Sequence, residues 1–117
     1  MTTSVKIDAR RIFDRESFHD VFAEHFGFPE FYGRNMNAWI DCMTDLDDPG
    51  AGMTSIHPPP RGVLTIELEH AGDFARRSPE LYQAIVESSA LVNLRKIQNG
   101  GASVLALAFW KQGEKKK

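Results

Sequence analysis

Cysteine is almost absent from this chain of 117 residues, because Cys42 is the only one. No internal disulfide can therefore form, which is typical of a reducing compartment, and we expect the protein in the cytoplasm. No apolar run approaches the roughly 20 residues that a membrane span needs. The first residues lack the basic and then apolar pattern of a signal peptide. We therefore expect no membrane association.

The sequence also lacks the motifs of the common phosphate-binding and metal-binding sites. It contains neither G-x-x-x-x-G-K-S/T nor G-x-G-x-x-G. Its four histidines do not have the i, i+4 spacing of a helical metal pair, and none is placed to activate the Cys42 thiol. The sequence thus predicts no catalytic residue, no metal ion and no cofactor. A metal-dependent enzyme built on His57, His70 and neighbouring acids stays open as an alternative.

What the chain does contain is typical of one small globular domain. Hydrophobic residues make up 42% of it and charged residues 26%. The length allows one core and is too short for two ordinary domains. We expect a domain over residues 1–110, with a Pro- and Gly-rich insertion loop at 47–62. The polar segment 111–117 is expected to be a disordered tail.

Strand-like and helix-like segments alternate along the chain. Period-2 or continuous apolar runs predict three strands, the central one buried on both faces, at residues 4–8, 62–68 and 103–110. Helical spacing and capping signals predict helices at 14–27, 36–46 and 78–97, with a loop at 70–73. In the first of these, Asp14 is the expected N-cap and Gly27 the expected C-terminal signal. The pair Ser88-Ser89 leaves open whether the last segment is one helix or two. Strands separated by helices favour an α/β fold, with a three-stranded parallel sheet packed with three to four helices.

The stretch from residue 28 to 46 combines a turn with an amphipathic helix. Residues 29–35 have turn chemistry: a proline, two aromatics, and then Gly33 before a polar side chain. Helical spacing predicts one face turned toward the core, carrying Met36, Trp39, Ile40 and Met43. The opposite face is polar and carries Asn37, Asp41, Thr44 and Asp45.

The acids of this stretch are concentrated. Between residues 30 and 48 there are five acids and one base, Arg34, whereas residues 95–117 carry six bases and one acid. Asp45, Asp47 and Asp48 crowd the end of the predicted helix, where the helix dipole disfavours negative charge by up to about 1 kcal/mol each. One interpretation is a solvated helix face. The other is a negative patch that binds a basic partner, such as a nuclease active site.

The run Pro29-Glu30-Phe31-Tyr32-Gly33-Arg34-Asn35-Met36-Asn37-Ala38 closely resembles the PEYYGxNLDAL signature of the barstar family. These proteins are small intracellular inhibitors of ribonucleases. The resemblance implies a small parallel three-stranded sheet with helices against it, and a protein that is not an enzyme. It also implies a monomer when free, which binds a ribonuclease protein and not the nucleic acid directly. In the family, the loop and the second helix plug the active site of the enzyme.

The resemblance also implies a set of partner-binding residues. Asp41 matches the acid that enters the phosphate site, and Phe31 matches an aromatic contact residue but lacks its hydroxyl group. With the acidic-face residue Asp45, the expected partner-binding residues are Phe31, Gly33, Asn35, Asn37, Ala38, Asp41, Thr44 and Asp45. Three positions depart from the best-known member: Asn37 replaces a second acid, Ile40 replaces a tryptophan, and Lys96 replaces a glutamate.

Two functions follow from these residues. The first is an inhibitor or immunity-type protein that occludes the active site of a ribonuclease or related basic toxin with its acidic helix, with Phe31 as an apolar anchor. Tyr32 and Trp39 are expected to pack in the core. The alternative is an interaction module of the same fold whose partner is not a nuclease, which the neutral Asn37 and the basic Lys96 favour.

Overall fold

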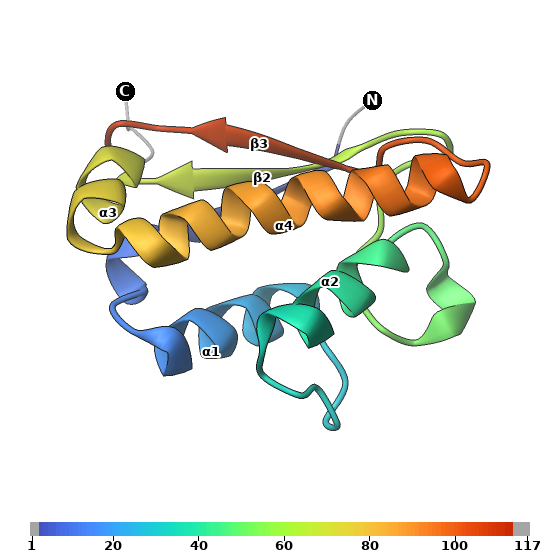
Figure 1. Cartoon of the computed structure of the whole chain (residues 1–117), viewed down its shortest axis with the longest axis horizontal. Helices are drawn as coiled ribbons and strands as arrows, with labels where there is room; N and C mark the ends of the chain where they lie inside the picture. Colours follow the sequence, from blue (N-terminus) through green and yellow to red (C-terminus); the bar gives the residue numbers. More distant parts are fainter. Residues whose placement is uncertain (1–2, 114–117) are drawn as a thin grey trace.

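Three parallel strands form the sheet in the computed structural model, which describes residues 3–113 (Figure 1). They are β1 (Thr3–Asp8), β2 (Leu64–Glu69) and β3 (Leu105–Phe109), in the spatial order β1-β2-β3. β1 pairs with β2 from the register Thr3↔Leu64, and β2 pairs with β3 from Leu64↔Leu105. The predicted α/β fold with a three-stranded parallel sheet is therefore confirmed.

Four α-helices connect the strands: α1 (Arg15–Phe26), α2 (Met36–Thr44), α3 (Ala71–Arg77) and α4 (Pro79–Gln98). Two short 3-10 helices are η1 (Ala9–Arg11) and η2 (Pro49–Ala51). As predicted, Asp14 caps the start of α1, where its carboxylate accepts from the Ser17 amide, and Gly27 ends this helix with a left-handed φ of 67°. α4 runs unbroken through Ser88 and Ser89, both of which are buried.

Among residues 3–113, helices cover only one face of the sheet, which corrects the prediction of a central strand buried on both faces. Along β2, Leu64, Ile66 and Leu68 are fully buried, whereas the alternating residues Thr65 and Glu67 are half-exposed. Figure 1 shows the helices on one side of the strands, with none of the drawn helices on the other. The alternation of apolar and polar side chains in β2 is typical of such a half-covered sheet.

A helix stands where the sequence predicts a loop after β2. The glycine at 72 reads as a loop signal, but α3 includes it because neighbouring contacts hold the turn. Phe74 is fully buried, and the Asp73 carboxylate accepts from Arg77 Nε at 2.9 Å. Arg77 also donates to the backbone oxygens of Ile12 and Ala9, each at 2.7 Å. The burial of Phe74 and the two bonds from Arg77 to Ile12 and Ala9 are tertiary, so local sequence does not reveal them.

The Pro- and Gly-rich segment 47–62 is attached to the core. The Ser55 amide donates to the Phe26 oxygen at 2.8 Å, which ties the segment to the end of α1. His57 Nδ1 donates to the Leu46 oxygen at 2.9 Å, just after α2. Thr54 is buried. Residues 54–57 of the segment are therefore anchored on the fold, whereas residues 47–52 are exposed.

The C-terminal residues Lys111–Gly113 follow β3, and residues 114–117, most of the expected tail, lie outside the described residues. Over residues 3–113, no helix has both the length and the apolar character required to cross a membrane.

Candidate functional site

The loop between α1 and α2 turns one aromatic side chain inward and its neighbour outward. Tyr32 is 8% exposed and packs on the Phe28 ring with 4.6 Å between the centroids. Phe31 is 75% exposed. The prediction of Tyr32 in the core is confirmed, and Phe31 is the aromatic of the motif that a partner can reach.

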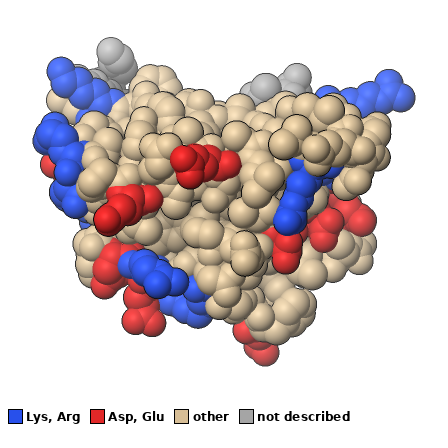
Figure 2. All heavy atoms as spheres, viewed as in Figure 1, with Lys and Arg blue, Asp and Glu red and all other residues tan. Residues whose placement is uncertain are grey.

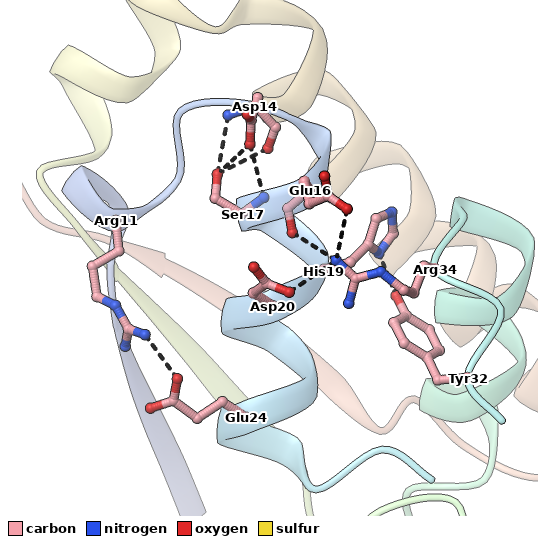
Figure 3. Close-up of polar contacts among 9 residues, drawn as sticks. All are labelled: Arg11, Asp14, Glu16, Ser17, His19, Asp20, Glu24, Tyr32 and Arg34. Atoms are coloured by element: carbon pink, nitrogen blue, oxygen red, sulfur yellow. Dashed lines mark hydrogen bonds and ion pairs between the residues drawn. The ribbon is translucent and has the colours of Figure 1, made fainter. Parts of the chain in front are cut away.

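A buried hydrogen bond anchors this loop to α1. The Tyr32 hydroxyl group lies 2.5 Å from His19 Nδ1, and Figure 3 shows the two side chains meeting between α1 and the loop. His19 is only 4% exposed, and burial lowers its pKa from 6.5 to about 4. The imidazole is therefore neutral at pH 7. Burial also raises the pKa of the Tyr32 hydroxyl, so that it stays protonated.

Arg34 provides a second attachment of the loop to α1. Its Nη2 donates to Asp20 Oδ1 at 2.8 Å and to the Glu16 backbone oxygen at 3.1 Å (Figure 3). Arg34, not Gly33, has the left-handed backbone of this turn, with φ of 57°. A non-glycine residue in this region is uncommon and is held there by its surroundings.

Helix α2 begins at a capped turn and buries the face predicted to be apolar. The Asn35 side chain accepts from the Ala38 amide at 2.8 Å, which satisfies a free donor at the helix start. Trp39 and Met43 are fully buried, and the Trp39 ring meets the Phe22 ring edge-on with 5.6 Å between centroids. This packing fixes the orientation of α2, so that its opposite face points to solvent.

The eight predicted site residues differ in what they expose. The exposed ones are Phe31, Gly33, Asn35, Asn37 and Asp41. Ala38, Thr44 and Asp45 are half-buried. Two of the eight already use their polar groups in hydrogen bonds within α2. Asn35 caps the helix, and Thr44 Oγ1 donates to the Ile40 oxygen at 2.6 Å.

Sequence reasoning missed that bases of α4 lie against the acids of the site. Arg95 Nη1 is 3.0 Å from Asp41 Oδ1, and Lys96 Nζ is 2.7 Å from Asp47 Oδ1. Figure 2 shows basic and acidic side chains in direct contact on this side of the molecule. The sequence does hint at this contact, because residues 30–48 are net acidic and residues 95–117 are net basic. The pairing itself requires knowing that α2 packs along α4.

The described residues do not form the catalytic thiol or the metal site that the sequence left to be considered. Burial, with the nearby charges of Asp41 and Asp45, raises the pKa of the Cys42 thiol to about 11, so the thiol is protonated and a poor nucleophile. His57 precedes β2 and His70 follows it, so the strand separates them. Within residues 3–113, no three His, Cys, Asp or Glu side chains are grouped so that they could hold a metal ion.

Comparison with known proteins relates the chain to a curated protein and to a protein family. One is "Putative ribonuclease inhibitor YrdF" of Bacillus subtilis (strain 168), which is 40% identical to this chain over 42 residues. That alignment covers 36% of this chain and 46% of the relative, so the chain spans about half the length of the curated protein that it matches. The other match is to the family described as Barstar (barnase inhibitor), whose members are non-enzymatic inhibitors, and it covers residues 2–96. With this match over most of its length, and with the parallel sheet and the capped, acid-bearing helix in place, the chain belongs to the barstar family.

Proposed function

We propose that this protein inhibits a ribonuclease by covering its active site with α2 and the loop before it. The observation that carries the proposal is the position of Asp41, whose carboxylate stands on the exposed face of α2, with two-thirds of its side chain accessible. A ribonuclease must hold phosphate groups with basic side chains. A carboxylate placed among them can accept the charge-assisted hydrogen bonds that a substrate phosphate would accept.

Neighbouring residues support this assignment. Phe31 exposes three-quarters of its surface on the loop before α2, and large aromatic residues are frequent binding hot spots. The loop is attached to α1 through Tyr32 and Arg34, so it is ordered before a partner arrives. Such preorganisation lowers the entropy cost of binding. We propose that the protein acts as a monomer in the cytoplasm, in keeping with the intracellular inhibitors of its family.

The Asp41→Ala variant tests the proposal. Against a panel of ribonucleases that includes barnase, we expect the wild-type protein to inhibit at least one enzyme. For that enzyme, the variant should bind more weakly by about 2–5 kcal/mol, the usual range for removing one member of a buried charge pair. Inhibition constants and calorimetry measure the loss. Thermal unfolding should change little, because Asp41 is exposed.

Asp73→Ala is the matched control, because Asp73 is also an exposed helical acid paired with an arginine, but on α3. It should bind the enzyme like the wild-type protein. Equal inhibition by Asp41→Ala and the wild-type protein would show that the site has been assigned wrongly.

A second candidate is a protein-interaction module whose partner is not a nuclease. The observation in its favour is that Arg95 and Lys96 already neutralise Asp41 and Asp47 within the chain. Absence of inhibition across the ribonuclease panel by the correctly folded wild-type protein would favour this candidate.

A further inference from the structure

Two ion pairs cross from the acidic site to the last turns of α4. The first joins Asp41 on α2 to Arg95, and the second joins Asp47, three residues after α2, to Lys96. In the first pair both side chains are substantially exposed, 67% for Asp41 and 43% for Arg95. In the second the lysine is more covered, with 19% of its side chain exposed. The site thus presents alternating charges rather than a uniformly negative surface.

These pairs are not what holds α2 in place. Exposed ion pairs typically contribute less than 1 kcal/mol to stability. The position of α2 follows from Trp39, Met43 and Leu46, all fully buried in the core. The bases on α4 can therefore be exchanged without loss of the fold, and their effect should be visible in binding.

A partner that places a cation on Asp41 must bring it close to the Arg95 guanidinium, because that group lies 3.0 Å from the same carboxylate. Juxtaposed like charges in an interface disfavour the complex strongly. A partner with only basic groups at this point is therefore penalised. A partner that also offers a carboxylate can pair with Arg95 while its own cation takes Asp41.

We propose that Arg95 and Lys96 determine partner specificity, by excluding ribonucleases with a uniformly basic active-site rim and by favouring one that carries carboxylates opposite the end of α4. This inference rests on the proposed function, since it concerns the same site. It identifies the partner class by charge pattern, with basic groups facing Asp41 and Asp47 and acidic groups facing Arg95 and Lys96.

The test uses barnase as the probe, because the family is described by its inhibition. Its binding to wild-type protein, Arg95→Gln, Arg95→Glu and Arg95→Lys is measured by calorimetry at low salt. We expect affinity to rise by about tenfold for Arg95→Gln and further for Arg95→Glu. Arg95→Lys, which retains the charge, should stay close to the wild-type value. The gain should shrink at high salt, because screening weakens the repulsion.

Arg11→Glu is the matched control for the change in total charge. Arg11 is also an exposed arginine in an ion pair, with Glu24 on α1, and it lies on η1 away from the α2–α4 contact. It should change the affinity for barnase by less than about threefold. Equal or weaker binding by correctly folded Arg95→Gln, or no binding by either, overturns the inference.

The proposed function has its own readout in the same experiment. Asp41→Ala is added to the Arg95→Gln protein, and the gained affinity should be lost. If the double variant keeps the gain, Arg95 still controls specificity but Asp41 is not the residue that the enzyme engages. The two proposals can therefore fail separately.

Discussion

At the scale of single residues, neighbours in the loop before α2 have opposite environments. Tyr32 is buried and bonded to His19, whereas Phe31 is three-quarters exposed. The sequence motif predicts both aromatics in a turn. Adjacent turn residues rarely both face a partner, and the resemblance to the family favours Phe31 as the exposed one. Nothing local predicts the bond to His19, because that residue is distant in the sequence.

Removing the Phe31 ring should affect binding and not folding. We expect Phe31→Ala to weaken binding to the inhibited ribonuclease by about 2 kcal/mol, as for aromatic hot spots. Unfolding free energy should change by less than about 0.5 kcal/mol, because the ring is exposed. Phe28→Ala is the contrast, since Phe28 is 9% exposed and its loss should cost about 3 kcal/mol or more. Denaturant unfolding and calorimetry together measure both effects, and a large stability loss for Phe31→Ala would contradict this assignment.

The buried His19 should make stability depend on pH. Its pKa is about 4 in the folded protein and near 6.5 when unfolded, so the unfolded chain binds more protons between these values. The stabilisation is complete above pH 6.5 and is lost as the pH falls toward 4, by about 3 kcal/mol in total. Denaturant unfolding across this range measures the loss.

The contribution of His19 can be isolated in two ways. His19→Gln should remove this part of the pH dependence. NMR titration of the wild-type imidazole reports its pKa directly, even if the variant does not fold. An imidazole that titrates near 6.5 in the folded protein would contradict the prediction.

At the scale of elements, the helix ends were the most predictable features. Asp14 and Gly27 were recognised from residue type, because capping is a local effect. α3 was missed because its stability comes from Phe74 in the core and from Arg77 bonded to distant carbonyl groups. The acids of the site were likewise recognised on α2 and after it, but their bases were not, since they come from α4.

Gly27 should be the least replaceable glycine, for two reasons. Its φ of 67° is strained for any other residue, and an added Cβ would lie 2.1 Å from Ser55 Oγ. Gly27→Ala should therefore lower the free energy of unfolding by about 2 kcal/mol or more. Gly72→Ala is the control, because Gly72 is helical with nothing within 4 Å of an added Cβ. It should stabilise by up to about 1 kcal/mol. Thermal or denaturant unfolding of both variants measures these changes. Similar losses of unfolding free energy in the two variants would be inconsistent with a special role for Gly27.

At the scale of the whole molecule, the order of strands and helices was sufficient to predict the parallel sheet. It was not sufficient to predict that helices cover the sheet on one face. β2 looks like a continuous apolar run, but buried apolar residues alternate in it with the less buried Thr65, Glu67 and Glu69. The charge pattern of the surface also belongs to this scale. A net charge of −2 hides a site where acids and bases are interleaved.

Salt should therefore act on binding far more than on folding. The ion pairs of the described residues are mostly exposed and contribute little to stability, so the melting temperature should shift by only a few degrees between about 0.05 and 0.5 M salt. Association with an inhibited ribonuclease should slow by about tenfold or more over the same range, because its electrostatic steering is screened. Stopped-flow mixing and thermal melts measure the two quantities, and an association rate that does not respond to salt would argue against a charged interface.

The parallel order of the strands also bears on when each part of the chain can fold during synthesis. The first strand has no neighbour until the residues opposite it, from Thr3↔Leu64 onward, have left the ribosome. The helices between them are complete earlier and can collapse around Trp39 and Phe22 first. Closing so long a loop is entropically costly and slows folding. We therefore expect α1 and α2 to pack on each other before the sheet that will support them has formed.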